Sequence, residues 1–362
     1  MSALHRPTLV VEDDWFLRLV GVVLDPATSP QRIDAFADFF SCDLPDFRSW
    51  MENVRQRVPA LYPAAVRLVD SEATYRAALP EAHAIVTESL PVGKAELAAA
   101  PRLRAVQKFG TITRSIDREA CAARGIPVLT LRRRANIACA EHAMALMLAL
   151  ARKLTRVAGR VSLEQLRDAG FQPKLYDRRH TAGSNWARVG GLSILSGTTL
   201  GILGLGEIGR ELATRAAAFG MRIVYHQRRP LPDAEAAQWH AAYRPFEALL
   251  AESDWVSVNV PGTAATRHLL DKAAFARMKA GARLVNVSRA DIVEREALIE
   301  ALGSGRLGGF ALDPLYEAPG RSDDALLEFE NVIITPHLAA QPRFNALGDM
   351  GDLIGQLEEN LR

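Results

Sequence analysis

Residues 200–212 read LGILGLGEIGREL, a short apolar run followed by a glycine-rich turn and the start of a helix. The spacing Gly204-x-Gly206-x-x-Gly209 has a physical reason in this frame. The first glycine permits a tight turn, the second lets the backbone approach a pyrophosphate, and the third lets the helix pack closely on the strand. The N–H groups at the helix start favour an anion. The pattern predicts a dinucleotide site; the alternative is a purely structural glycine turn.

Strand-like and helix-like runs alternate on both sides of this turn. Short apolar strands separated by helices indicate parallel sheets, so we expect an α/β protein with a doubly wound sheet around the glycine turn. A long helix is expected from about Asn136, a good N-cap residue, and an irregular surface connection at 170–191. Strands are expected near the N-terminus at 8–12, 17–25, 65–70, 83–88, 103–109 and 126–130, and downstream at 222–225, 255–261, 283–288, 308–313 and 332–336.

Composition excludes several classes of function. The chain has 362 residues, is 49% hydrophobic and carries a net charge of +2, which gives no reason to expect nucleic acid or a charged membrane surface as partner. Its three cysteines are scattered without metal-ligand spacing, so no metal is expected. The most apolar stretch, 137–151, contains Glu141 and His142 and is shorter than the ~20 residues that a bilayer requires. We therefore expect a cytoplasmic protein.

The strand after the glycine turn ends in IVYHQRRP, residues 223–230. In a dinucleotide-binding unit, an Asp or Glu at this place binds the ribose 2′-OH of NAD. Here His226 takes the place of the acid, and Arg228 and Arg229 follow it. Arginines bind a 2′-phosphate by charge-assisted hydrogen bonds, which favours NADP, with NAD possible if both arginines are only solvated loop residues.

Further motifs follow in order. They are CAEHAMALMLALAR (139–152), RLVNVSRADIVEREAL (283–298), GRLGGFALDP (305–314) and NVIITPHLAAQP (331–342). Together with the glycine turn, they resemble the D-isomer-specific 2-hydroxyacid dehydrogenase family from about residue 100 to 342. The resemblance implies two Rossmann-like domains and a homodimer. We expect a dinucleotide-binding domain at 133–338 and a flavodoxin-like substrate domain made of 1–132 and 339–362.

The resemblance also implies a catalytic set. Arg289 matches the arginine that clamps the substrate carboxylate, His337 the acid/base histidine, and Asp313 an aspartate that bonds the nicotinamide carboxamide. A 2-keto acid does require a fork-shaped cation for its carboxylate and a proton donor near its carbonyl oxygen. The family's glutamate before the proline of its LDVFxxEP motif is Ala318 here, so Glu317 is the candidate partner of His337.

The family loop that binds the substrate carboxylate reads GTITRSID, residues 110–117, in this chain. Ile112 replaces a glycine and Arg114 an acid. A basic run at 132–134, with Lys108, either binds a second anionic group of the substrate or forms a solvated face. The expected substrate-binding residues are Gly110, Thr111, Ile112 and Thr113.

The function expected from these motifs is interconversion of a 2-keto acid and a D-2-hydroxy acid with NAD(P), of the glyoxylate/hydroxypyruvate-reductase type. The alternatives are a 3-phosphoglycerate dehydrogenase type of enzyme and a non-catalytic, dinucleotide-sensing scaffold of the same fold. The expected cofactor-binding residues are Gly204, Gly206, Glu207, Ile208, Gly209, His226, Arg228, Arg229, Val260, Pro261, Thr266, Val287, Ser288 and Asp313.

Overall fold

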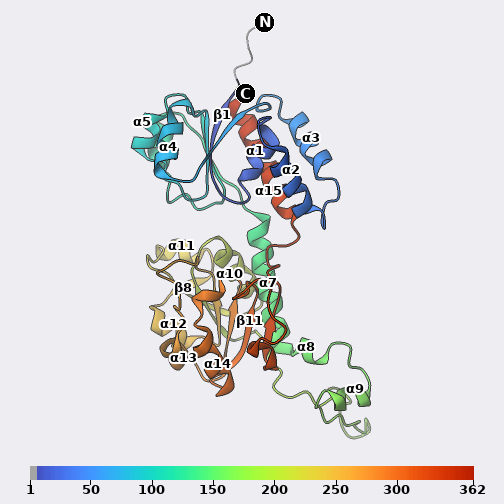
Figure 1. The fold of residues 1–362 in the computed structure, drawn as a ribbon. Helices are drawn as coiled ribbons and strands as arrows, with labels where there is room; N and C mark the ends of the chain where they lie inside the picture. Colours follow the sequence, from blue (N-terminus) through green and yellow to red (C-terminus); the bar gives the residue numbers. More distant parts are fainter. Residues whose placement is uncertain (1–5) are drawn as a thin grey trace. The chain divides into compact units, whose positions relative to one another are not determined.

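A computed structural model describes residues 6–362 and divides them into two compact units (Figure 1). Unit 1 comprises the chain up to Asn136 together with Ala340–Arg362, and unit 2 is Ile137–Ala339. The first boundary lies inside helix α7 (Arg134–Arg152). Each unit is built on one parallel sheet, which confirms the expected α/β class.

Unit 1 has a five-stranded sheet in the order β2-β1-β3-β4-β5, the flavodoxin-like order. Alternate residues of β1 point to opposite faces: Leu9 and Val11 join the core under α1, α3 and α15, whereas Val10 joins the core under α4, α5 and α6. The strands are β1 (Thr8–Glu12), β2 (Ala65–Val69), β3 (Ala84–Thr87), β4 (Ala105–Lys108) and β5 (Val128–Leu129). The helices are α1 (Arg18–Leu24), α2 (Pro30–Phe40), α3 (Phe47–Arg57), α4 (Glu72–Ala78), η1 (Leu79–Glu81), α5 (Lys94–Ala99), α6 (Arg118–Ala123) and α15 (Phe344–Leu361).

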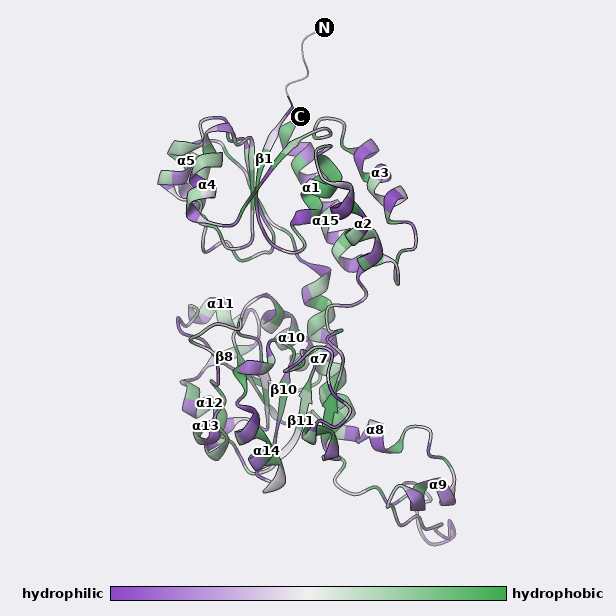
Figure 2. Ribbon diagram, viewed as in Figure 1, coloured by the Kyte–Doolittle hydropathy of each residue, from purple (hydrophilic) through white to green (hydrophobic). Residues whose placement is uncertain are grey.

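The strand expected at 17–25 is wrong, because Arg18–Leu24 form helix α1. Six consecutive residues of this helix are buried, and Figure 2 colours it hydrophobic over most of its length. A continuous apolar run does not separate a buried strand from a helix that is buried all round. Asp14 provides the local signal for a helix, since its carboxylate accepts hydrogen bonds from the N–H groups of Phe16 (2.9 Å) and Leu17 (3.3 Å).

Unit 2 has a seven-stranded parallel sheet in the order β12-β11-β10-β9-β6-β7-β8. The order reverses at β6 and β9, so the sheet is doubly wound. Helices α12, α13 and α14 pack their apolar residues on one face. The strands are β6 (Thr199–Leu203), β7 (Arg222–His226), β8 (Ala241–Tyr243), β9 (Trp255–Val258), β10 (Ala282–Asn286), β11 (Leu307–Leu312) and β12 (Val332–Ile334). The helices after α7 are α8 (Leu154–Val157), α9 (Leu163–Asp168), α10 (Glu207–Ala218), α11 (Asp233–Ala237), α12 (Phe246–Glu252), α13 (Lys272–Arg277), η2 (Ala290–Ile292), α14 (Arg295–Gly303) and η3 (Ala325–Glu328).

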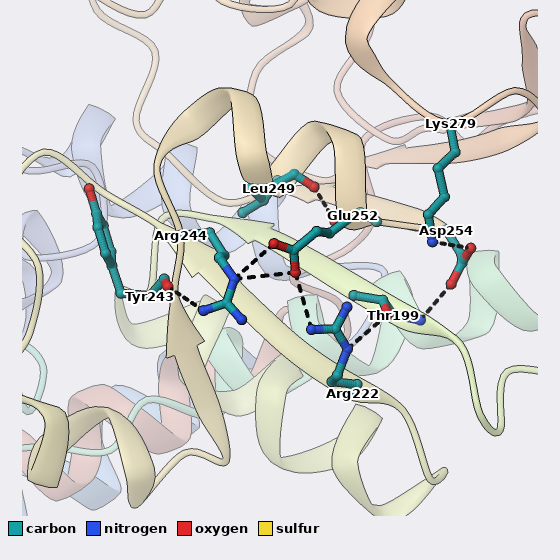
Figure 3. Close-up of polar contacts among 9 residues, drawn as sticks. Thr199, Arg222, Tyr243, Arg244, Leu249, Glu252, Asp254 and Lys279 are labelled. Atoms are coloured by element: carbon teal, nitrogen blue, oxygen red, sulfur yellow. Dashed lines mark hydrogen bonds and ion pairs between the residues drawn. The ribbon is translucent and has the colours of Figure 1, made fainter.

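Charged side chains tie helix α12 to the strands beside it (Figure 3). The Glu252 carboxylate accepts hydrogen bonds from Arg244 (3.0 Å) and from Arg222 (3.1 Å). Asp254 accepts from the backbone N–H of Thr199 (2.8 Å) and from the Lys279 ammonium group (2.8 Å). These contacts join the first residues of β6 and β7 to residues that follow β8 and precede β9.

Helix α7 begins at Arg134, two residues before the expected N-cap Asn136. Its first N–H groups are satisfied by a carboxylate from α15: Asp349 accepts from the N–H of Arg134 (2.9 Å) and of Ala135 (3.4 Å). A negative charge also suits the positive end of a helix dipole. In residues 6–362 no helix, α7 included, combines the length and the apolarity needed to cross a membrane.

The segment after α7 leaves the sheet of unit 2 as an extended arm that carries α8 and α9 (Figure 1). Residues 170–191 contain neither helix nor strand, which confirms the irregular connection expected there. Several large apolar side chains of this arm are exposed, namely Leu154, Val161, Leu175, Tyr176, Leu192 and Ile194.

Candidate active site

The glycine turn lies between β6 and α10, at the carboxyl edge of the sheet of unit 2. Gly204 has φ +94° and donates its N–H to the carbonyl of His226 (2.8 Å). A Cβ on Gly204 would lie 2.7 Å from the carbonyl oxygen of Asn259, and one on Gly209 would lie 2.2 Å from the carbonyl oxygen of Gly204. Around Gly206 the situation is the opposite, because a Cβ there would meet no described atom within 4 Å. The turn therefore fits a dinucleotide, with open space beside the N-terminal end of α10. Glu207 and Ile208 form the first turn of this helix.

The end of β7 carries the histidine and the arginines. His226 is partly buried: its Nδ1 lies 3.1 Å from the carbonyl of Arg244, and its ring packs 5.6 Å from that of Phe246. Arg228 and Arg229 are exposed, and neither forms an ion pair within residues 6–362. This end of the sheet thus presents two uncompensated guanidinium groups.

The loop after β9 contains three of the expected cofactor residues. The Thr266 hydroxyl donates to the carbonyl of Pro261 (2.7 Å), and the Ser288 hydroxyl donates to the carbonyl of Val260. Val287, before Ser288, is buried. Asn259, which the sequence reasoning missed, has a buried Oδ1 without a hydrogen-bond partner in the described part of the chain. Such an acceptor beside the glycine turn is available to a bound polar ligand.

Arg289 follows β10 on a loop that a buried asparagine organises. Asn286 donates to the carbonyl of Arg289 (2.7 Å) and accepts from the N–H of Ser288 (2.9 Å). The Arg289 side chain is exposed, and a Cβ on Gly262 would lie 2.7 Å from its Cγ. A larger residue at position 262 would therefore displace the guanidinium group.

His337 follows β12 on a tight turn. Its φ is +55°, its side chain is exposed, and its N–H donates to the carbonyl of Asp313 (2.9 Å). Asp313 follows β11 directly and is fully buried. Because β10, β11 and β12 are neighbouring parallel strands, Arg289, Asp313 and His337 follow them at one edge of the sheet.

Glu317 does not contact His337 in this structure. Within residues 6–362, His337 forms no ion pair with any carboxylate, and Glu317 is exposed on a surface depression that Tyr316 and Arg321 also line. Ala318 is exposed as well. The assignment of Glu317 as the partner of His337 stays a prediction.

Gly110, Thr111, Ile112 and Thr113 belong to unit 1, on the loop after β4. Gly110 has φ +148° and accepts at its carbonyl from the N–H of Leu131 (2.9 Å). The positive φ explains why glycine is needed there.

Much of the neighbouring basic run is engaged in unit 1 itself. Arg133 forms an ion pair with Glu88 (3.0 Å) and lies over the ring of Phe109. Burial raises the pKa of Glu88, and the Arg133 charge opposes that shift. Arg134 pairs with Asp349 and Asp352. Arg133 and Arg134 therefore both have structural partners in unit 1.

Comparisons with known proteins agree with this geometry. Residues 144–339 match the family model described as D-isomer specific 2-hydroxyacid dehydrogenase, NAD binding domain. The chain is 35% identical to a D-3-phosphoglycerate dehydrogenase of Mycobacterium leprae over 73% of its own length, but spans only 46% of that relative. It is 33% identical to the glyoxylate/hydroxypyruvate reductase B of Salmonella newport, over 84% of this chain and 90% of that protein.

The fold has solved counterparts. The holo form of Rhodotorula graminis D-mandelate dehydrogenase aligns with a TM-score of 0.55 and 24% identity, covering 97% of this chain and 93% of that one. At this identity the likeness concerns the fold alone. The family match and the relatives together confirm the resemblance expected from the sequence: the chain belongs to the D-isomer specific 2-hydroxyacid dehydrogenase family of NAD-dependent oxidoreductases.

Proposed function

We propose that this protein interconverts a 2-keto acid and a D-2-hydroxy acid. The observation that carries the proposal is the placement of Arg289 and His337. They follow β10 and β12, the two strands that flank β11, at the sheet edge that also bears the glycine turn. A carboxylate-binding cation, an ionisable ring and a dinucleotide turn at one edge are the groups that this reaction requires.

In the proposed mechanism a reduced nicotinamide dinucleotide held at the turn of Gly204, Gly206 and Gly209 would supply the hydride for C2 of the keto acid. The Arg289 guanidinium binds the substrate carboxylate. The protonated His337 ring donates its proton to the carbonyl oxygen, so that one hydride and one proton convert the ketone into an alcohol. Glu317 is proposed to pair with His337 during turnover. A general acid of this kind contributes ~10²–10⁴ to the rate.

We further propose NADP(H) as the favoured cofactor. Its support is the pair of exposed arginines after β7, which have no carboxylate partner in the described chain, and the absence of an acid from residues 226–230. The test is kcat/KM with NADPH and with NADH, for the wild type and for Arg228→Ala with Arg229→Ala. We expect the wild type to prefer NADPH and the double variant to lose that preference. A tenfold wild-type preference for NADH would contradict the proposal.

The substrate is proposed to be a small 2-keto acid of the glyoxylate or hydroxypyruvate type. The Salmonella relative, which is named for these two compounds, is covered over 90% of its length. The M. leprae relative makes 3-phosphohydroxypyruvate the second candidate. The engagement of Arg133 and Arg134 within unit 1 favours the smaller substrate, because those charges are already compensated.

The decisive experiment is turnover of glyoxylate, hydroxypyruvate, phenylpyruvate and 3-phosphohydroxypyruvate with both cofactors. We expect activity that His337→Ala removes while cofactor affinity stays within about twofold of the wild type. Arg289→Lys should raise KM, since an ammonium group lacks the bidentate fork. Cofactor binding without turnover of any of these acids would support the scaffold alternative instead.

We also propose a homodimer. The arm after α7 exposes Val161 (78%) and Ile194 (64%), and a second copy of the chain is the proposed cover for these side chains. Sedimentation should give a dimer for the wild type and a monomer for Val161→Glu with Ile194→Glu. A wild-type monomer would refute this assignment.

A further inference from the structure

A cavity of about 190 Å³ lies at the amino edge of the sheet of unit 2, at the opposite end of the strands from the glycine turn. Its walls come from the last turn of α7, from α8 and from residues at the starts of β10, β11 and β12. Among the described residues, the lining contains three cations, Lys153, Arg156 and Arg283, and one carboxylate, which belongs to Glu330. The cavity is far larger than the ~10–15 Å³ that a single water requires. It therefore combines an excess of positive charge with room for a polyatomic ion.

Arg283 brings a half-buried charge to this cavity. Its guanidinium donates to the hydroxyl of Ser193 (2.9 Å) and lies over the ring of Trp255, but it forms no ion pair within residues 6–362. Asp254, whose carbonyl accepts from the N–H of Arg283 (3.0 Å), pairs its carboxylate with Lys279 (2.8 Å) instead. Burial lowers the pKa of the Arg283 guanidinium, and no neighbouring carboxylate opposes that shift. Because a charge withdrawn from water is costly without a counter-charge, an anion beside Arg283 is favoured.

Lys153 supplies a second charge without a carboxylate partner in the described chain. It follows α7 directly with φ +51°, a left-handed conformation that glycine or asparagine usually adopts at a helix end. A Cβ on Gly191 would lie 3.2 Å from its Nζ, so the ammonium group lies beside the returning end of the arm. The last carbonyls of α7 do not need this ammonium group. Those of Leu150 and Ala151 accept from the N–H groups of Lys153 (3.3 Å) and Ser193 (2.9 Å).

The other polar side chains of the lining are either paired or able to donate. Arg156 forms an ion pair with Glu330 and also donates to the carbonyl of Ala169 (2.9 Å). The Thr155 hydroxyl and the Asn331 carboxamide line the same cavity, and neither side chain forms a hydrogen bond with another residue that the structure describes. Both groups can donate to an oxygen atom. The cavity thus offers two uncompensated cations and two neutral donors.

We propose that this cavity binds a phosphate group between Lys153 and Arg283. A phosphate group carries a charge of about −1.5 to −2 at pH 7, which matches the two uncompensated cations. A guanidinium binds phosphate oxygens through paired hydrogen bonds, and an ammonium group binds them as a point charge. Since Arg283 contacts Ser193 and Lys153 lies beside Gly191, a phosphate would also join the two ends of the arm that carries α8 and α9. The inference goes beyond the proposed function and does not depend on turnover.

The test measures the Kd of inorganic phosphate by titration calorimetry on the full chain, at constant ionic strength and with saturating NADPH. We expect Lys153→Met and Arg283→Met each to raise this Kd at least tenfold, because each removes one of the two charges. Lys174→Met is the matched control, since this lysine of the same arm is exposed and lies outside the cavity; its Kd should stay within twofold of the wild type. Arg228→Ala with Arg229→Ala should also bind phosphate as the wild type does, which separates the cavity from the arginines after β7.

Hydrogen exchange locates the site. Phosphate should slow exchange at residues 153–157 and at Ser193 at least fivefold in the wild type and not in Lys153→Met, while exchange at 226–230 stays unchanged. If Arg283→Met does not fold, Lys153→Met decides together with Arg283→Lys, which keeps the charge and should raise Kd no more than fivefold. Glycerol 3-phosphate forms a second arm of the titration, and the lower of the two Kd values shows whether the group binds free or as a monoester.

Three results would overturn the proposal. The first is an equal phosphate Kd for the wild type, Lys153→Met and Lys174→Met. The second is acetate that binds as tightly as phosphate at the same ionic strength, which would show that the cavity does not select a dianion. The third is phosphate binding to Val161→Glu with Ile194→Glu but not to the wild type, which would show that a carboxylate of a second copy fills the cavity.

Discussion

Single alanine substitutions at Gly206 and Gly209 should separate cofactor binding from folding. The Cβ of an alanine at 209 would lie 2.2 Å from the carbonyl oxygen of Gly204 and 3.2 Å from its carbonyl carbon. Both are backbone atoms, so no side chain can rotate away. Overpacking of this kind typically costs about 1–3 kcal/mol, and we expect Gly209→Ala to lose free energy of unfolding at the upper end of that range.

For Gly206→Ala we expect the opposite result, with no loss of unfolding free energy. Gly206 has φ −80°, which alanine adopts readily, and its Cβ would meet no described atom within 4 Å. A glycine replaced under such conditions stabilises a protein by about 0.4–1 kcal/mol, because the unfolded chain loses freedom. The new methyl group would occupy the space through which a pyrophosphate approaches the turn. We therefore expect at least a tenfold weaker cofactor affinity, about 1.4 kcal/mol, without loss of stability.

Urea unfolding followed by circular dichroism measures the free energy of unfolding of the apo-protein. Titration calorimetry with NADPH and NADH measures the cofactor affinity. Gly201→Ala serves as a control, since its Cβ would meet the side chains of Ser253 and Leu249 away from the turn and should affect stability only. Wild-type affinity in Gly206→Ala would show that no pyrophosphate lies against this turn. Wild-type stability in Gly209→Ala would refute the packing argument.

Three more predictions concern charge and space. Glu252→Gln should cost no more than about 1.5 kcal/mol of unfolding free energy in urea, and less in 1 M salt, because both ion pairs that it weakens are at least a third exposed. Burial acts to raise the pKa of Glu12, but hydrogen bonds led by that of Ser89 outweigh it and lower the pKa. The Glu12 carboxylate therefore contributes its full stabilisation above its ordinary pKa of about 4.3, and this stabilisation is lost as pH falls through the lower pKa of the folded state. Acid titration of Glu12→Gln should accordingly show a flatter stability profile below pH ~5. Gly262→Leu should raise the keto-acid KM at least tenfold and leave cofactor Kd unchanged, because it displaces Arg289; an unchanged KM would refute the role of that arginine.

The sequence predicts unit 2 well because its signals are local. The glycine turn needs Gly204 for its positive φ and Gly209 because a Cβ there would meet the carbonyl of Gly204, and both reasons lie within one strand–turn–helix unit. Apolar runs separated by helices also predict a parallel sheet, and the strand ends then place Arg289 and His337 at one edge. The strand expected at 17–25 is wrong because a continuous apolar run is equally typical of a helix buried all round.

Tertiary partners could not be predicted in this way. Nothing near Arg134 in sequence indicates that Asp349, 215 positions away, starts helix α7. The partner of His142 could not be predicted either, because the position of this residue in an apolar run indicated only a helix too short for a membrane. Its contact with Thr335 depends on how α7 packs beside β12, and a single sequence does not contain that information.

Several buried or half-buried acids of this chain nevertheless share one behaviour. Glu12 accepts from the amides of residues 88–90, Asp349 from those of 134 and 135, and Glu358 from those of 60 and 61. A carboxylate withdrawn from water is tolerated when several donors surround it, and the amides of an irregular segment need acceptors for the same reason. Each acid thus fixes a distant piece of backbone. Asp313 has the same surroundings, with the amides of 338 and 339 as donors. The same two contacts therefore connect the turn after β12, on which His337 lies, to the end of β11.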